Sequence, residues 1–155
     1  MKKSSIIIIL SAILFGLIVI QFFPIDKSVP ESDPEVDFLV VTNPPRRIIS
    51  VLKASCYDCH SYKTRYPWYS NAAPISWKLK SHINEGLEHL NFSEFGKYSR
   101  EESNHALREM KEVIREKEMP LKSYLLFHKE ARLSSEKREM LIQWLSLGKN
   151  DVKIP

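Results

Sequence analysis

Cys56-Tyr57-Asp58-Cys59-His60 is the stretch that decides both the fold and the chemistry expected of this chain. The spacing Cys-x-x-Cys-His is typical of the attachment site of a c-type haem. Two thiols three positions apart can each add to one vinyl group of the porphyrin and form a thioether. The histidine that follows then lies below the ring, where a neutral imidazole nitrogen can bind iron. The motif predicts one covalent haem c, held by Cys56 and Cys59, with His60 as the proximal iron ligand.

The alternative interpretation of the two cysteines is a redox-active thiol pair of the thioredoxin kind. That chemistry is expected within a βαβ pattern, and no segment alternates apolar and polar residues with a period of two for a useful length. Both cysteines of the chain belong to the motif, so none is left for a structural disulfide. The surrounding sequence therefore favours haem.

The charge balance argues against a nucleic-acid partner. The chain has 155 residues, with 23 Lys and Arg against 19 Asp and Glu. Lys2 and Lys3 lie outside the expected folded part, which leaves 21 basic against 19 acidic side chains (23 minus 2). Phosphate binding needs a concentrated basic face, and a nearly neutral domain does not predict one.

The N-terminal residues 1–23 predict an uncleaved membrane anchor. Residues 6–23 are apolar apart from Ser11, Gly16 and Gln21, and as a helix they span about 27 Å, close to the hydrocarbon thickness of a bilayer. Lys2 and Lys3 precede them, so the positive-inside rule keeps the N-terminus in the cytoplasm. We therefore expect the haem domain on the periplasmic side of a bacterial inner membrane. The alternative is a cleaved signal peptide, but residues 19–24 offer no small-x-small cleavage site.

Residues 24–45 predict an extended tether between the anchor and the domain, because they are rich in proline and acidic residues. Its five prolines are Pro24, Pro30, Pro34, Pro44 and Pro45. The apolar residues 38–41 either dock on the domain or form a short strand, and the sequence leaves both open.

Residues 46–149 predict an all-α, cytochrome-c-like domain around the haem. Short helices are expected over 46–54, 75–87 and 122–130, with a loop over 66–74. Ser99 and Glu102 form a capping-box pattern that begins a further helix, which Pro120 ends. The last helix is expected to begin with Ser134 as its N-cap and to end at Gly148.

The second axial iron ligand is the open question of the site. Met110 and Met140 fall on apolar helix stripes and are expected in the core. Met119 instead follows the charged run 115–118, lies outside the apolar stripe and precedes Pro120. We favour Met119 as the distal ligand, because a thioether is the usual partner of histidine in electron-carrying c haems.

Histidine is the alternative distal ligand. His128 is the strongest candidate, because Leu125 and Phe127 place it near apolar surface. The other three stand among charged residues, where a solvated histidine is the commoner outcome; they are His82, His89 and His105.

Two further expectations concern the surroundings of the haem. Aromatic residues that follow the motif should cover the porphyrin; they are Tyr66, Trp68, Tyr69 and Trp77. The carbonyl oxygen of Pro67 or Pro74 should accept the Nδ1 proton of His60 and so orient the ring.

Several stretches resemble the family of small bacterial haem-binding domain proteins, and the likeness covers roughly residues 43–147. The matching segments are 55–61, 67–69, 73–77, 88–93, Met119-Pro120, and Tyr124 with His128 through to Trp144. The resemblance implies one covalent haem, a cytochrome-c-like helical domain and an N-terminal membrane anchor. Members often have Met-Pro-Pro where this chain has Met119-Pro120-Leu121. The chain thus departs from the family pattern at Leu121 but keeps the Met119 sulfur.

The leading functional interpretation is a membrane-tethered electron carrier rather than an enzyme, with redox proteins as its partners. The main alternative is a five-coordinate haem protein that senses or reacts with peroxide, nitric oxide or carbon monoxide. In a third interpretation the haem is only structural. No Ser-His-Asp set and no Gly-rich phosphate loop is evident in the sequence.

Overall fold

The computed structural model describes residues 3–147, and these form helices and turns without any strand. The all-α prediction is confirmed. In chain order the α-helices are α1 (Lys3–Val19), α2 (Phe38–Thr42), α3 (Arg46–Ser55), α4 (Tyr57–His60), α5 (Ile75–His89), α6 (Arg100–Arg115) and α7 (Ser135–Leu147). The 3₁₀ turns are η1 (Ile20–Phe22), η2 (Pro34–Val36), η3 (Trp68–Asn71), η4 (Phe95–Lys97), η5 (Tyr124–Leu126) and η6 (Lys129–Ala131).

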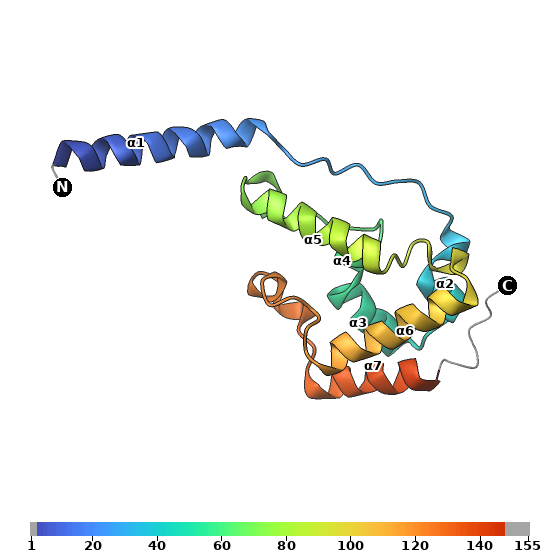
Figure 1. The fold of residues 1–155 in the computed structure, drawn as a ribbon. Coiled ribbons are helices and arrows are strands. Elements are labelled where there is room, and N and C mark those ends of the chain that lie inside the picture. Colours follow the sequence, from blue (N-terminus) through green and yellow to red (C-terminus); the bar gives the residue numbers. More distant parts are fainter. Residues whose placement is uncertain (1–2, 148–155) are drawn as a thin grey trace.

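α1 projects away from the domain and continues into η1 (Figure 1). Residues 3–22 are long and apolar enough to cross a membrane, and no residue of α1 is buried against the rest of the chain. In a soluble domain such an apolar helix would be buried, because exposed apolar surface is unfavourable in water. The expected N-terminal helix is therefore present.

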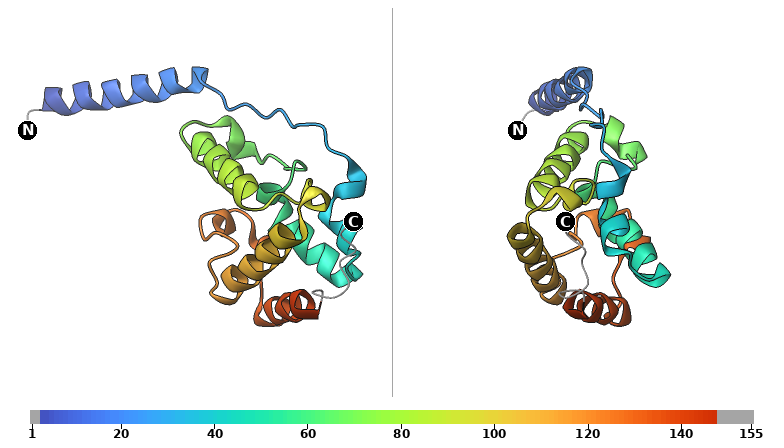
Figure 2. Two further views of the ribbon diagram at one scale, coloured as in Figure 1. Left: turned by 45° about the vertical axis from the view of Figure 1, so that its right-hand side comes forward. Right: turned by 90° about the vertical axis from the view of Figure 1, so that its right-hand side faces the viewer.

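The core of the domain lies between α3, α6 and α7, with α2 packed on it (Figures 1 and 2). Phe38, Leu52 and Leu141 are fully buried there. The ring centroid of Phe38 lies 4.7 Å from those of both Phe92 and Phe95. Residues 38–42 thus dock on the domain as a short helix, which decides between the two alternatives left open for this apolar stretch.

Local sequence signals gave the positions of most helices correctly. The capping box of α6 is formed, since the Ser99 amide donates to the Glu102 carboxylate at 2.7 Å and the Glu102 amide donates to the Ser99 hydroxyl at 3.3 Å. Ser134 likewise accepts from the Lys137 amide at 3.2 Å and caps α7. Gly148, the expected end of that helix, lies outside the described residues.

The helix expected over residues 122–130 is wrong. Two separate 3₁₀ turns, η5 and η6, occupy this segment. Leu126 and Phe127 are exposed instead of facing the core. A short helix in water depends on burying an apolar face, and this segment buries too little to stabilise one.

Candidate functional site

α4 carries most of the motif, and Cys56 joins it to α3. The amide nitrogens of Cys59 and His60 both donate to the carbonyl oxygen of Cys56, at 3.2 and 3.0 Å. One helical turn brings residues three and four apart onto the same side. Cys56, Cys59 and His60 accordingly line a single cavity.

The cavity has a volume of about 320 Å³, at the lower end of the range of roughly 300–1,000 Å³ that is usual for ligand and cofactor sites. Its lining comes from two parts of the chain. The first comprises residues of α4 and α5, and the second comprises residues of α6 and of segment 119–124. Its apolar lining includes Leu90, Phe92, Ala106, Met110, Ile114 and Leu121.

His60 is held by the end of α5. Its Nδ1 lies 2.9 Å from the carbonyl oxygen of Gly86 and 3.1 Å from that of Leu90. Carbonyl oxygens only accept hydrogen bonds, so Nδ1 carries the proton and Nε2 presents its lone pair. Burial lowers the pKa of His60, against the opposing effect of these two bonds, and keeps the ring neutral at neutral pH. The imidazole is thus fixed in the form that binds a metal.

These acceptors correct the expectation that Pro67 or Pro74 would orient His60. α4 and α5 approach each other closely at Gly86, where a Cβ atom would lie 2.8 Å from the carbonyl oxygen of Cys59. Only glycine fits there, and the close approach is what brings two α5 carbonyls to the His60 ring. α5 continues past Gly86 to His89, two residues beyond the end expected at residue 87.

The two thiols lack the character of a redox pair. Burial raises the pKa of Cys56 to about 12 and that of Cys59 to about 11, with the neighbouring ionisable groups adding to both shifts. Reactive thiols of the thioredoxin kind have lowered pKa values, because the thiolate is the nucleophile. The site therefore disfavours the thiol-redox alternative.

Two methionines reach the cavity. Met119 lies on the segment after α6, is partly buried, and donates its amide to the carbonyl oxygen of Val113 at 3.3 Å. Met110 is buried in the core cluster, as expected, and also lines the cavity. Met140 packs against the core and is absent from the lining. The structure thus brings Met119 together with both cysteines and His60.

The chain matches the model of the haem-binding domain family over residues 15–147. The protein belongs to this family. The match spans the end of α1 and the whole described domain, so haem binding is the function that the comparison shows. No curated protein and no solved structure matches the chain.

The residues of the cavity fit a haem. The lining is mostly apolar, as a porphyrin requires, and a neutral imidazole presents an unpaired Nε2 toward it. The Met119 thioether, two thiols and this imidazole all border the same space. Two histidines expected to be solvated, His82 and His89, also line the cavity.

His128 lies outside the haem cavity. Its Nε2 is 2.9 Å from the Tyr69 hydroxyl, and its Nδ1 is 3.1 Å from the Glu130 carboxylate. The ring stacks on Tyr124 with centroids 4.1 Å apart. Because both ring nitrogens have partners and the residue is not part of the lining, the structure gives no support to His128 as the distal ligand.

The expectation that four aromatic residues after the motif cover the porphyrin is wrong. None of Tyr66, Trp68, Tyr69 and Trp77 lines the cavity. Trp68 is 75% exposed, because the chain after α4 leads away over the outer end of α5 (Figure 1). The aromatic lining comes instead from Phe92 and Tyr124.

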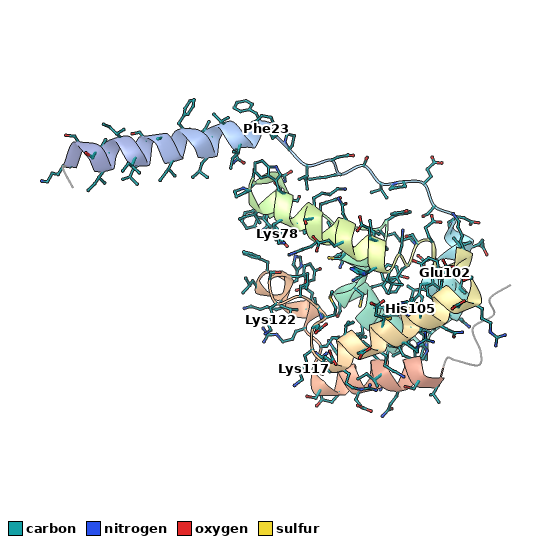
Figure 3. All side chains as sticks on the ribbon, viewed as in Figure 1. Phe23, Lys78, Glu102, His105, Lys117 and Lys122 are labelled. Carbon is teal, nitrogen blue, oxygen red and sulfur yellow. The ribbon has the colours of Figure 1, made fainter. Side chains whose placement is uncertain are left out.

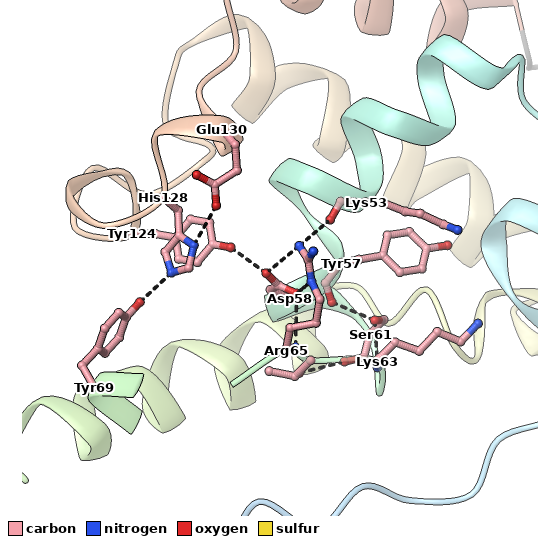
Figure 4. Close-up of polar contacts among 11 residues, drawn as sticks. Lys53, Tyr57, Asp58, Ser61, Lys63, Arg65, Tyr69, Tyr124, His128 and Glu130 are labelled. Carbon is pink, nitrogen blue, oxygen red and sulfur yellow. Dashed lines mark hydrogen bonds and ion pairs between the residues drawn. The ribbon is translucent and has the colours of Figure 1, made fainter. Parts of the chain in front are cut away.

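Asp58, inside the motif, links it to the segment that carries Met119 (Figure 4). The buried carboxylate accepts the Tyr124 hydroxyl at 2.8 Å and forms two bonds with the Arg65 guanidinium at 3.1 and 3.2 Å. Burial and the hydrogen bond to Asp58 raise the pKa of Tyr124, which keeps its hydroxyl protonated as a donor. The sequence analysis did not predict the contact between Asp58 and Tyr124, because nothing in the local sequence relates residues so far apart.

Proposed function

We propose that this haem-binding protein is a membrane-tethered monohaem c-type cytochrome that carries electrons on the extracytoplasmic side of the membrane. We further propose that it acts as an electron carrier and not as an enzyme. The observation that carries the proposal is the convergence of Cys56, Cys59 and a tautomerically fixed His60 on one apolar cavity.

Each of the four residues has a separate role in this proposal. Cys56 and Cys59 hold the haem as thioethers, His60 binds the iron through Nε2, and Met119 supplies the second ligand from the segment after α6. When bound, the haem supplies an iron that takes up and gives back one electron. The carbonyl oxygens of Gly86 and Leu90 keep the His60 ring in place, which limits rearrangement of the site between oxidation states.

The proposed location is supported by α1. The apolar helix of residues 3–22, which begins at Lys3 and is preceded by Lys2, is expected to insert with its N-terminus in the cytoplasm. The domain then lies outside, where the anchor confines it near redox proteins of the same membrane and raises their effective concentration. Those donor and acceptor proteins are its proposed partners.

Covalent attachment is tested on the full chain, expressed together with the export and haem-ligation machinery. We expect the haem to stay with the polypeptide on a denaturing gel and to give a c-type pyridine haemochrome spectrum. A colourless protein whose two thiols are both open to alkylation would overturn the proposal.

Ligation is tested with carbon monoxide added to the reduced protein. The proposed Met119 ligand should slow and weaken binding, and the oxidised protein should show a weak sulfur-to-iron charge-transfer band at the red end of the spectrum. Rapid stoichiometric binding without that band would instead support the five-coordinate sensor. A haem that exchanges no electrons with small redox carriers would support the structural interpretation.

A further inference from the structure

The end of the anchor is fixed to the domain by side-chain contacts. The Gln21 amide group bonds the backbone of Ala73 twice: its nitrogen donates to the Ala73 carbonyl and its oxygen accepts from the Ala73 amide, both at 3.0 Å. The Trp77 indole donates to the Phe23 carbonyl at 2.8 Å. The chain thus leaves α1 directly against η3 and the beginning of α5, before the proline-rich segment begins.

Exposed apolar side chains collect beside this contact. Beyond Phe23, eight large apolar residues of the described chain are exposed, and five of them lie in η3, at the beginning of α5 or at η5. These five, which we call the apolar face, are Trp68 (75% exposed), Ile75 (49%), Trp77 (40%), Leu126 (72%) and Phe127 (56%). The rings of Trp68 and Phe127 touch, with centroids 6.4 Å apart.

The apolar face points in the direction from which α1 projects. In Figures 1 and 2, η3, the first turn of α5 and the orange segment with η5 all lie on the side of the domain toward α1. Figure 3 places Phe23, Lys78 and Lys122 along this edge and Glu102 on the other side. A bilayer surface drawn across the end of α1 would therefore meet the apolar face.

The segments that carry the apolar face also differ in charge from the rest of the domain. Residues 66–84 and 119–129, which carry the apolar face, contain four lysines and no acidic residue. Residues 85–118 contain nine acidic and six basic residues, and the acidic excess lies outside α6 itself, which has four of each. Lys78 and Lys122 are exposed beside the apolar face, where they would meet anionic phospholipid headgroups.

We propose that the apolar face, flanked by these lysines, rests in the interfacial region of the anionic outer surface of the membrane that α1 spans. Trp side chains prefer this depth, where an apolar ring and a polar N–H are both accommodated. The inference rests on the proposed anchoring by α1. It replaces a freely swinging domain with one of fixed orientation, in which the α6 side faces the aqueous phase and is open to redox partners.

The test uses the full chain in nanodiscs that contain an anionic phospholipid with a diazirine at the beginning of its acyl chain. After illumination, cross-linked peptides are mapped by mass spectrometry. We expect cross-links in α1, in residues 66–78 and in residues 122–128, and none in α6 or α7. Cross-links confined to α1 would overturn the docked orientation while leaving the anchoring intact. Their absence from α1 as well would overturn the anchoring and this inference together.

A pair of variants provides the control. Trp68→Ser should reduce cross-linking of residues 122–128, since Trp68 packs against Phe127 at the apolar face. Leu147→Ser removes an equally exposed apolar residue from α7, which lies away from α1, and should change nothing. An unchanged haem absorption spectrum shows that each variant is folded. Equal effects of the two variants, or no effect of Trp68→Ser, would contradict the proposal.

Discussion

His60 and Met119 line the same cavity, but the chain holds them by different means. His60 lies in a helical turn that packs against α5, and two main-chain carbonyls fix its ring at 2.9 and 3.1 Å. Met119 lies on a connecting segment whose amide makes one bond of 3.3 Å to Val113. A side-chain hydrogen bond from Tyr124 to Asp58 joins that segment to the motif.

This difference determines which replacements each side of the cavity tolerates. Backbone groups position the histidine, so only a replacement that shifts the backbone of α4 or α5 is expected to move it. The segment with Met119 is held by main-chain bonds to Val113 and by the side-chain bond from Tyr124 to Asp58, and this side-chain bond makes the distal side the more adjustable one. In a cytochrome the axial ligand sets much of the reduction potential, so the distal segment is where the potential can be tuned.

The largest effect is expected when both thiols are removed. The double replacement Cys56→Ala and Cys59→Ala takes away both proposed thioether bonds, so no haem should remain with the polypeptide after denaturation. A haem-stained denaturing gel measures this loss. Ser55→Ala alters a neighbouring residue of the same cavity lining and should leave the stain unchanged. Haem retained by the double variant would show that attachment does not depend on these sulfurs.

The next effect is expected at the distal ligand. Met119→Ala should open one iron position, speed carbon monoxide binding and lower the potential by about 0.1 V or more, within the roughly 0.8 V range that axial ligands cover. Met110→Leu is the matched control, because Met110 also lines the cavity but belongs to the core. If Met110→Leu alone removed the charge-transfer band, Met110 would be the ligand.

A smaller effect, on stability, is expected where α4 meets α5. Gly86→Ala places a Cβ atom 2.8 Å from the carbonyl oxygen of Cys59 and forces the two helices apart. Overpacking of this kind costs about 1–3 kcal/mol, which exceeds the gain of roughly 0.5–1 kcal/mol for alanine over glycine within a helix. Thermal unfolding of the holoprotein measures the balance.

Asn84→Ala is the control for that replacement. It changes an exposed position of the same helix and should leave the free energy of unfolding nearly constant. A stabilised Gly86→Ala variant would show that α4 and α5 have room to separate, and that the proximal side is less rigid than the contacts indicate.

Sequence reasoning succeeded where the determining contacts are local. The capping box of α6 involves residues three apart, and the Cys-x-x-Cys-His spacing brings its own side chains together in one turn. The helix expected over 122–130 failed because its outcome depends on whether Leu126 and Phe127 find a core to face, and they do not.

The residues that support the site could not be predicted from the sequence, because their contacts join distant parts of the chain. Gly86 contacts Cys59 across 27 positions (86 minus 59), and Tyr124 bonds Asp58 across 66. No periodic pattern relates residues so far apart along the chain. The motif therefore predicts which groups would hold a haem, while the groups that orient His60 and join the two sides emerge only from the fold.

The smallest effect is expected at the hydrogen bond between Tyr124 and Asp58, which joins the His60 side of the cavity to the Met119 side. This bond tests most directly whether the two sides differ in rigidity. Tyr124→Phe keeps the aromatic ring but removes the hydroxyl that donates to Asp58 at 2.8 Å. Losing a hydrogen bond to a charged group costs about 1.5–3 kcal/mol, and Asp58 keeps three bonds from Arg65, two from the guanidinium and one from the main-chain amide. We expect a loss near the lower end of that range, measured by chemical unfolding. Faster carbon monoxide binding should accompany it, because the segment with Met119 is held less firmly.

Tyr66→Phe, whose hydroxyl makes no hydrogen bond within residues 3–147, should change neither quantity. If Tyr124→Phe lowered stability but left carbon monoxide binding unchanged, the main chain rather than this side-chain link would fix Met119, and the two sides of the cavity would be equally rigid.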